Sequence, residues 1–329
     1  MIEPMAVREA PEAQALEEYR TELTAYCYRM LGSAFEAEDA VQETMLRAWR
    51  ALDKFEGRSQ LRSWLYSIAT NVCLDVLGGK EHKVRPIQLG DPGAPVIESL
   101  AATRPQGEWV LPMPDGRVVD DGGDPAEVAA AKETLKLAFI AALQFLPPKQ
   151  RAVLILRDVL RWKASEVAEL LDTSEASVNS ALQRARATLD ERDVTVDEPA
   201  DVMDDEHQDL LQRYMDAFER YDMDALTALL HEDATLSMPP YELWLTGHDD
   251  IVEWMMGPGH QCEGSRLVPV AANGSIAFGQ YRASGPNGEH EPWGLVIIET
   301  KDGQVSGINT FLDTASLFPL FGLPPSLDG

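Results

Sequence analysis

Residues 39–49 read Asp39-Ala40-Val41-Gln42-Glu43-Thr44-Met45-Leu46-Arg47-Ala48-Trp49, and this stretch decides the fold of the N-terminal part. Its apolar residues recur at spacings of three and four, so we expect an amphipathic helix over residues 36–52. The side expected to be buried carries Val41, Met45, Ala48, Trp49 and Leu52. The opposite side carries Asp39, Gln42, Glu43, Leu46 and Arg50. Such a polar side is most often simply solvated, but it also suits docking on another protein.

The flanking segments predict two more helices and a loop with nucleic-acid-binding character. Apolar spacing indicates helices over residues 12–31 and 59–77. The loop 54–60 between helices contains Phe55, Gly57 and Arg58, with Arg47, Arg50 and Arg62 nearby. Cations can follow a phosphate backbone while an aromatic ring or a pocket takes an unstacked base. The loop therefore indicates binding to melted nucleic acid.

Composition indicates a multidomain globular protein. The 329 residues carry a net charge of -27, but residues 193–329 hold 25 acidic and five basic side chains, so most of the acidity belongs to the C-terminal part. Attraction to phosphates depends on local patches, and nucleic acid is therefore not excluded as a partner. Because no apolar run approaches bilayer length, we expect no membrane association and a cytoplasmic location. Cys27, Cys73 and Cys262 lack metal spacing and are expected to be free thiols.

Two breaks divide the chain into three folded units. Residues 78–124 are rich in proline and glycine and cannot sustain a helix or a central strand. Residues 193–205 form a second, acidic break that includes Pro199. Within the first break, Trp109, Pro112 and Pro114 form an aromatic and proline-rich stretch suited to docking, although a solvated kink would have the same composition.

The second unit predicts a helix-turn-helix. A helix over 127–146 ends at Pro147, and Pro148 can begin the next helix. A short helix over 164–171, a tight turn at 172–174 with a capping serine, and a longer helix over 175–189 complete the pattern. The outer face of the last helix carries Ser177, Asn179, Ser180, Gln183, Arg184 and Arg186. These side chains can contact base edges and phosphates, although many helical hairpins bind no DNA.

Taken in order, these motifs resemble the extracytoplasmic-function (ECF) sigma factors of bacterial RNA polymerase over residues 12–192. The resemblance divides the chain into sigma region two (1–80), a linker (81–124), sigma region four with its helix-turn-helix (125–192), an acidic linker (193–203) and a C-terminal domain (204–329). It implies a protein that gives the polymerase core its promoter recognition and melts DNA without nucleotide hydrolysis, needing no cofactor and no metal.

The resemblance also implies roles for individual residues. Docking on the clamp helices of the largest polymerase subunit falls to Asp39, Gln42, Glu43 and Arg47. Melting and reading the promoter element about ten bases upstream falls to Phe55, Arg58, Ser59, Arg62 and Asn71. Reading the element about thirty-five bases upstream falls to the outer-face residues of the helix-turn-helix given above. Trp64 matches a family tryptophan, but its apolar neighbours favour core packing. Asn179 and Ala181 stand where many members carry basic residues, so we expect weaker, less salt-sensitive DNA binding here.

The third unit predicts an α+β fold. Two helices over residues 210–230 and a third over 249–256 precede four strand-like stretches at 266–271, 276–283, 293–300 and 305–312. The turns Asn273-Gly274, Asn287-Gly288 and Asp302-Gly303 separate these stretches, which indicates an antiparallel meander. The pattern is similar to SnoaL-like, nuclear-transport-factor-2-like domains, whose sheet and helices enclose a conical cavity. The expected fold class is therefore multidomain: two all-α sigma domains followed by an α+β SnoaL-like domain.

The function of the third unit stays open at this point. Candidate pocket residues are Tyr241, Trp244, His248 and Asp313, together with His260 and Asn309. They suit three alternatives: an isomerase- or hydrolase-like enzyme with an attached DNA-binding module, a small-ligand site, or a purely regulatory domain. In fused sigma factors of this kind, the resemblance implies that the extension regulates activity in place of a separate anti-sigma protein. It also implies that the linker residues Trp109, Pro112 and Pro114 contact this extension. We also expect the apolar tail 318–325 to pack back against the protein.

Overall fold

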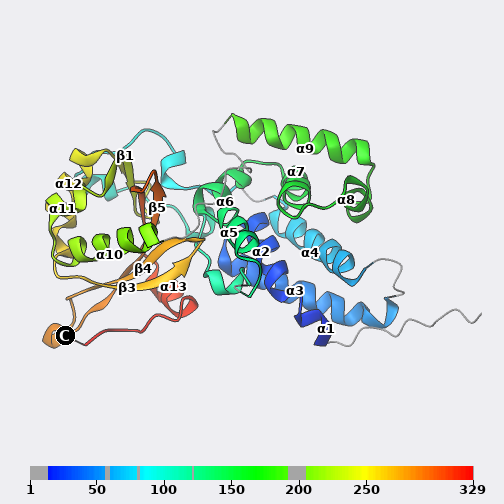
Figure 1. The fold of residues 1–329 in the computed structure, drawn as a ribbon, viewed down its shortest axis with the longest axis horizontal. Helices are drawn as coiled ribbons and strands as arrows, with labels where there is room; N and C mark the ends of the chain where they lie inside the picture. The colour runs from blue at the N-terminus through cyan, green and yellow to red at the C-terminus, as the bar shows by residue number, and fades with distance from the viewer. Residues whose placement is uncertain (1–13, 56–59, 80–81, 121, 192–204, 329) are drawn as a thin grey trace, which may run out of the picture.

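A computed structural model describes residues 14–55, 60–79, 82–120, 122–191 and 205–328. The helical units lie at one end of an elongated molecule, and the sheet with its helices lies at the other; part of the linker, in cyan, runs over the sheet end near β1 (Figure 1). Among the described residues, no helix combines the length and the apolar character that crossing a bilayer requires.

The first helical unit packs three main helices around one core. Its elements are α1 (Gln14–Glu17), α2 (Arg20–Leu31), α3 (Ala34–Ala51), the 3-10 turn η1 (Leu52–Lys54) and α4 (Leu61–Leu77). Gly32 ends α2 in the left-handed conformation, and the Ser33 side chain then caps α3 by accepting the Glu36 N–H. Trp49 differs from expectation, because 62% of it is exposed. It lies one residue beyond the fully buried Ala48, about 100° further around the helix.

The second helical unit has the expected helix-turn-helix and one unexpected break. Its elements are α5 (Pro125–Glu133), α6 (Leu137–Gln144), α7 (Pro148–Leu154), the π-helical turn η6 (Ile155–Val159), α8 (Ala164–Leu170) and α9 (Glu175–Asp190). The single helix expected over 127–146 is interrupted because Lys136 has extended backbone angles. Ser174 caps α9 as predicted, by accepting the Ser177 N–H at 3.2 Å.

Over its described residues, the linker holds short 3-10 turns between extended stretches and no longer helix, as its proline content predicts. These turns are η2 (Pro86–Gln88), η3 (Ile97–Leu100), η4 (Gln106–Glu108) and η5 (Asp115–Arg117). The linker is nevertheless well packed: Trp109 and Met113 are almost completely buried. Its conformation is therefore fixed by contacts with its neighbours rather than by regular secondary structure of its own.

The C-terminal unit is a six-stranded sheet with helices on both faces. Its helices are α10 (Asp205–Glu219), α11 (Met223–Thr227), α12 (His248–Met256) and α13 (Thr314–Leu320), with 3-10 turns η7 (Pro258–Cys262) and η8 (Pro286–Gly288). Its strands are β1 (Leu230–Ser237), β2 (Trp244–Thr246), β3 (Arg266–Ala272), β4 (Ser275–Arg282), β5 (Glu291–Lys301) and β6 (Gln304–Phe311). The order is β2-β1-β6-β5-β4-β3, with only β1 and β6 parallel. The meander β3–β6 is confirmed, whereas β1 and β2 were not predicted.

The two faces of the sheet belong to different cores. On one face, Phe278, Val296 and Ile308 pack with the helices α10–α12 in a cone-shaped arrangement, where the Tyr214 ring stacks on Phe278 with centroids 5.7 Å apart. On the other face, Leu295 and Ile297 belong to a core that continues through the linker into both helical units. The apolar tail packs back on this second face as predicted, since Phe318 and Leu323 are buried there.

Candidate functional site

The outer face of α3 is exposed and has an apolar margin. Asp39 and Gln42 are exposed and Glu43 is half-buried. The Arg47 guanidinium donates to Glu43 at 2.7 Å and reaches Asp75 on α4 at 3.4 Å. Beside them, Leu46 is 41% exposed. A polar face with an uncovered aliphatic side chain has the composition of a protein interface.

The residues predicted to read melted DNA are only partly available. Asn71 is exposed, and the Phe55 ring packs on Trp64 with centroids 4.9 Å apart. Arg62 forms a two-pronged ion pair with Glu22, with contacts between 2.8 and 3.0 Å, and its guanidinium lies 5.4 Å from the Trp162 ring. Arg58 and Ser59 lie outside the described residues.

A cavity of about 330 Å³ lies between α4 and α8, the first helix of the helix-turn-helix, which also contact each other. The α4 side supplies Gln60, Ser63, Trp64 and Ser67, and the α8 side supplies Glu166, Glu169 and Leu170. The half-buried Trp64 thus lines a cavity as well as packing on the core. Two carboxylates therefore lie opposite the helix expected to read promoter DNA.

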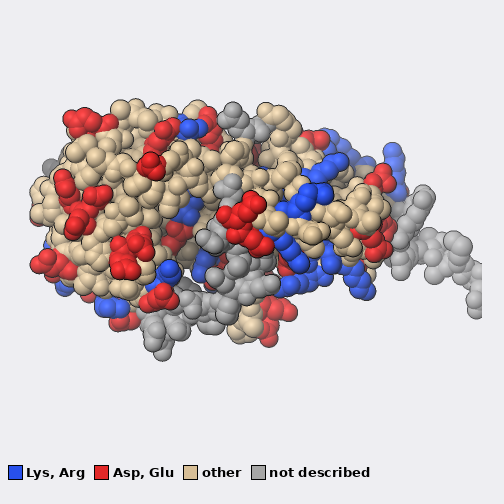
Figure 2. All heavy atoms as spheres, turned by 90° about the horizontal axis from the view of Figure 1, so that it is seen from above, with Lys and Arg blue, Asp and Glu red and all other residues tan. Residues whose placement is uncertain are grey.

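The outer face of α9 is open to solvent. Ser177, Asn179, Ser180, Gln183 and Arg184 are all exposed. Arg186 differs, because its guanidinium binds the buried Asp158 carboxylate through contacts of 2.7 and 2.8 Å. In a view onto α9, basic side chains gather on the helical half, whereas acidic ones dominate the C-terminal half (Figure 2).

Buried guanidiniums join the two helical units. Arg151 donates to both the side chain and the backbone carbonyl of Gln144, at 2.6 and 2.8 Å, and to the Met30 carbonyl of α2. Arg29 of α2 donates to Thr134 Oγ1 at 2.7 Å. Burial lowers the pKa of both arginines to about 10. At neutral pH both stay charged, so their hydrogen bonds must be kept for the units to stay together.

A two-residue turn of the C-terminal domain touches the other units. Asn273 is fully buried, and its backbone N–H donates to the Met113 carbonyl of the linker at 3.1 Å. Its side-chain amide accepts the Met113 N–H at 2.9 Å and donates to the Tyr28 hydroxyl of α2 at 2.7 Å and the Leu135 carbonyl at 2.6 Å. One asparagine thus joins the C-terminal domain, the linker and both helical units.

The second residue of this turn, Gly274, completes the contact. Asn273 and Gly274 both have positive φ, of 55° and 62°, as a two-residue hairpin turn requires. A Cβ on Gly274 would lie 2.7 Å from the Lys132 backbone oxygen, so a larger residue does not fit. The Gly274 N–H donates to Asp115 at 2.8 Å. The Asn-Gly pair predicts this turn, but no feature of the sequence predicts its contacts with the other units. We name Asn273 and Gly274 the interdomain turn.

A buried ion pair holds the linker at a second point. The Arg85 guanidinium binds the Glu299 carboxylate of β5 at 2.6 and 3.0 Å and donates to Asn309 Oδ1 at 2.9 Å. Burial alone would raise the pKa of Glu299, but the charge and hydrogen bonds of Arg85, with the Asn309 amide, lower it below its ordinary value. Asn309 therefore supports this ion pair rather than a pocket.

The linker tryptophan lies where docking was expected. Trp109 is 1% exposed, its indole N–H donates to the Arg104 carbonyl at 3.2 Å, and its backbone pairs with Val84. Pro112 is buried, and Pro114 forms a β-bridge with Ala272 of β3. The linker is therefore docked rather than solvated in this structure.

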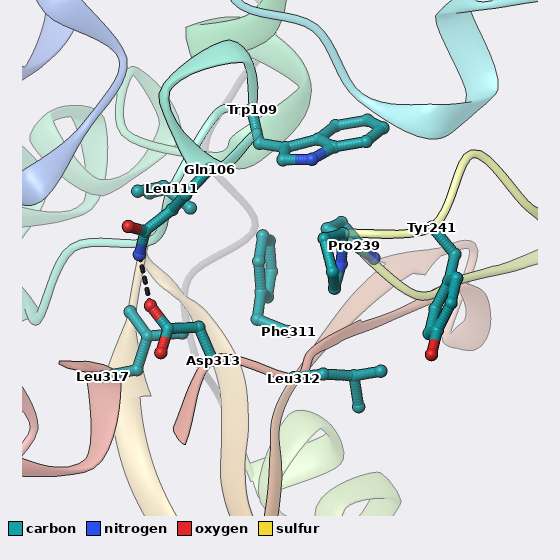
Figure 3. A pocket seen from close by; sticks show the side chains of 10 residues that line it. Gln106, Trp109, Leu111, Pro239, Tyr241, Phe311, Leu312, Asp313 and Leu317 are labelled. Carbon is teal, nitrogen blue, oxygen red and sulfur yellow. Dashed lines mark hydrogen bonds between the residues drawn. The ribbon is translucent and has the colours of Figure 1, made fainter. Parts of the chain in front are cut away.

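The four candidate pocket residues do not converge. Tyr241 and Asp313 line a cavity of about 300 Å³ between the linker and the C-terminal domain (Figure 3). Trp244 instead donates to the Gly90 carbonyl at 3.1 Å, and His248 lies 3.0 Å from the His231 carbonyl. His260 faces Glu263 at 3.3 Å. Sequence spacing could not show this separation, because it depends on how loops fold over the strand ends.

Cysteine and metal chemistry add no further site in the part of the chain that is described. Cys27 and Cys73 are buried, Cys262 is half-buried, and all three are free thiols, as predicted. Burial raises the pKa of the Cys262 thiol above its ordinary value. Over the described residues, no three His, Cys, Asp or Glu side chains come together as metal ligands would.

Comparison with known proteins identifies the class. The chain matches the family models of Sigma-70 region 2 over residues 15–81, Sigma-70 region 4 over 136–189 and a SnoaL-like domain over 211–308. It is 45% identical over 328 residues to the ECF RNA polymerase sigma factor SigG of Mycobacterium tuberculosis, which covers 99% of this chain and 87% of that protein. The chain therefore belongs to the ECF RNA polymerase sigma factors.

Within this family, the chain is a member that carries a SnoaL-like C-terminal extension. SigJ of M. tuberculosis is 28% identical over 252 residues, covering 75% of this chain and 72% of that protein. The crystal structure of M. tuberculosis SigJ aligns with a TM-score of 0.61 at 25% identity and covers 95% of this chain and 100% of that chain. As a sigma factor, the protein binds the RNA polymerase core and promoter DNA.

Proposed function

We propose that the C-terminal domain holds the two sigma domains together in the free protein, and that promoter binding requires them to separate. The observation that carries this proposal is the interdomain turn, where buried Asn273 bonds to the linker and to both helical units. Because one amide donates to both Tyr28 and Leu135, separation of the two helical units breaks at least one of these bonds. The C-terminal domain therefore opposes opening with the free energy of the buried hydrogen bonds that are lost.

The predicted binding surfaces on α3 and α9 are already exposed, so they need no conformational change to bind their partners. Asp39, Gln42, Glu43 and Arg47 would dock on the clamp helices of the largest polymerase subunit, since the face they form is uncovered. Ser177, Asn179, Ser180, Gln183 and Arg184 would read the upstream promoter element. Arg186 would instead hold α9 on Asp158. With these partners the protein would act in the cytoplasm.

The surface that reads the nearer promoter element requires opening. Elements centred about ten and thirty-five bases upstream lie roughly 85 Å apart along B-form DNA, at about 3.4 Å per base pair. In the free protein α4 packs directly against α8 of the helix-turn-helix, with Glu166 and Glu169 facing it. These carboxylates would repel DNA phosphates from α4. Both elements can be read together only when the two sigma domains separate.

The contact between the C-terminal domain and the sigma domains consists of buried hydrogen bonds rather than attraction between acidic and basic surfaces. The C-terminal domain is acidic and could have covered the basic DNA-facing side chains of α9. The α9 face is exposed instead, and the domain acts through the linker and the interdomain turn. The enzyme alternative gains nothing from the geometry, because Trp244 and His248 bond to backbone carbonyls away from the cavity that Tyr241 and Asp313 line.

In vitro transcription with core polymerase tests the proposal. Asn273→Ala removes the side-chain bonds between domains, and we expect it to raise promoter-dependent initiation several-fold. Asp302→Ala is the matched control: Asp302 also has positive φ, of 52°, in a two-residue hairpin turn, but it is exposed. Backbone strain is therefore similar in both variants, while only the first loses interdomain bonds.

Two outcomes would contradict the proposal. Equal transcription by Asn273→Ala and the wild type, with both folded by circular dichroism, would mean that the interdomain turn does not restrain the sigma domains. An equal increase in Asp302→Ala would assign the effect to the hairpin rather than to the contact.

A further inference from the structure

The cavity in Figure 3 is built from two separate parts of the chain. The linker supplies Gln106, Trp109 and Leu111, and the C-terminal domain supplies Pro239, Pro240, Tyr241, Phe311, Leu312, Asp313 and Leu317. Its volume is about 300 Å³. Because both parts are needed to enclose it, the cavity exists only while the linker is docked.

This cavity lies where the core of the SnoaL-like cone meets the core shared with the linker. The cone interior is the face where Phe278 and Val296 pack with α10–α12. Tyr241 and Leu312, which line the cavity, pack against this cone core, whereas Phe311 and Leu317 belong to the core shared with the linker and the helical units. A ligand in this cavity would therefore contact both the linker and the C-terminal domain.

The lining has an unusual combination of groups. Three aromatic side chains, Trp109, Tyr241 and Phe311, surround the space, and no lysine or arginine lines it. Asp313 is the one carboxylate. It accepts hydrogen bonds from the neutral Gln106 amide and from the Ser316 N–H at 3.3 Å, and no described cation pairs with it. Aromatic faces attract cations through their quadrupole, and an unpaired carboxylate adds a full opposite charge.

We infer that this cavity binds a small organic cation, an amine or quaternary ammonium attached to an apolar ring. The size fits, because a cavity of about 150 Å³ accommodates benzene. The 300 Å³ here leaves room for a bicyclic ring and a short aminoalkyl chain. Such a ligand contacts the linker and the C-terminal domain at once and therefore stabilises the docked arrangement. Reduced transcription is the consequence, and this consequence alone rests on the proposed function.

Calorimetric titration of the full chain tests the site with two probes. Tryptamine carries an ammonium group at neutral pH, and tryptophol has the same ring and chain length with a hydroxyl instead. We expect tryptamine to bind at least about tenfold more tightly than tryptophol, with a Kd of about 1 mM or below. Excess tryptamine should also lower promoter-dependent transcription by the wild type.

Three variants locate the binding. Asp313→Asn removes the charge but can still cap α13, so the fold should persist, and the preference for tryptamine over tryptophol should disappear. Leu312→Phe fills the cavity and should weaken both probes. Asp302→Asn changes an exposed acidic residue of the same domain and should leave both affinities unchanged.

The outcomes separate the two proposals. Equal affinity for tryptamine and tryptophol, no binding of either at millimolar concentration, or an unchanged preference in Asp313→Asn would overturn the site. Selective tryptamine binding that leaves transcription unaltered would support the site and would count against the restraint by the C-terminal domain.

Discussion

Arg85 and Glu299 lie 214 positions apart in the chain, yet they form a mostly buried ion pair. Their side chains are 11% and 19% exposed, and Asn309 donates to the same carboxylate at 3.2 Å. A carboxylate removed from water in this way is stable only while its cation stays in place. At the scale of single residues, this pair ties the docking of the linker to the stability of the C-terminal sheet.

Glu299→Gln should lower the free energy of unfolding by about 2 kcal/mol, because it leaves the Arg85 charge buried without its counterion. The measurement is urea denaturation followed by circular dichroism. Glu242→Gln is the control: Glu242 also pairs with a linker arginine, Arg104, at 2.7 Å, but both side chains are about one-third exposed. Its loss should be less than about 1 kcal/mol. Similar losses in the two variants would contradict the role of burial.

The ion pair of Arg85 and Glu299 also predicts how the free energy of unfolding changes with pH. The pKa of Glu299 is lower in the folded protein than its ordinary value of 4.5. Its contribution to stability is therefore complete above about pH 4.5 and is lost as the pH falls through the folded pKa. The stability difference between wild type and Glu299→Gln should stay constant near neutral pH and shrink below pH 4.5. A difference that grows in acid would contradict the sign.

Among the elements, α3 carries the exposed face that we propose to dock on core polymerase. Gln42→Ala and Glu43→Ala should each weaken binding to core polymerase, by roughly tenfold if these residues are central to the interface. Both side chains reach solvent, so the first helical unit should remain folded. Binding is measured by fluorescence anisotropy of the labelled chain. Gln212→Ala changes an exposed glutamine on α10 and is the control, which should leave the affinity for core polymerase unchanged. Unchanged affinity in both α3 variants would rule out this docking surface.

On the outer face of α9, we predict that one side chain reads sequence and its neighbour binds phosphate. Gln183→Ala should relax the preference for the upstream element, since an amide can make two bonds to an adenine edge. Arg184→Ala should weaken binding to all sequences and reduce the salt dependence by about one unit of slope if it contacts a phosphate. Titrations with matched and scrambled promoter DNA at several salt concentrations measure both effects. Loss of sequence preference in Arg184→Ala alone would reverse these assignments.

The helices and the meander were predictable because their signals are local. Apolar spacing places α2, α3, α4 and α9, and the Asn-Gly and Asp-Gly pairs place the hairpin turns. Strand β1 was missed because its sequence, Leu230–Ser237, contains His231, Glu232 and Asp233 and reads as polar. Its pairing with β6 is parallel and depends on residues about seventy positions away, which a local pattern does not contain.

Most site residues were predictable by type but not by environment. The outer faces of α3 and α9 followed from helix geometry alone. The pairing of Arg62 with Glu22 and of Arg186 with Asp158 did not, because each joins elements that are distant in sequence. Asn273 shows the limit most clearly. An Asn-Gly pair predicts a turn from its φ angles, but its contacts with Tyr28, Met113 and Leu135 exist only after the domains have packed.

At the scale of the whole molecule, the sigma domains, the linker and the C-terminal domain share one continuous core. Separation of the sigma domains would expose buried Arg29 and Arg151 and break their bonds to neighbouring carbonyls. Core polymerase and promoter DNA must supply that free energy through the contacts they make with the open form. In the view of Figure 2, acidic side chains dominate the C-terminal half and basic ones gather on the helical half, so DNA phosphates are directed towards the helical half.

The most direct test of this account is the distance between the two sigma domains, measured by fluorescence energy transfer. Probes replace exposed Glu18, beside α1, and exposed Asp190, at the end of α9. We predict a single defined distance in the free protein and an increase of at least roughly 20 Å when core polymerase and promoter DNA are added, since the two elements lie far apart on the duplex. An unchanged distance in a complex that initiates transcription would contradict the proposal that the two sigma domains separate on promoter DNA.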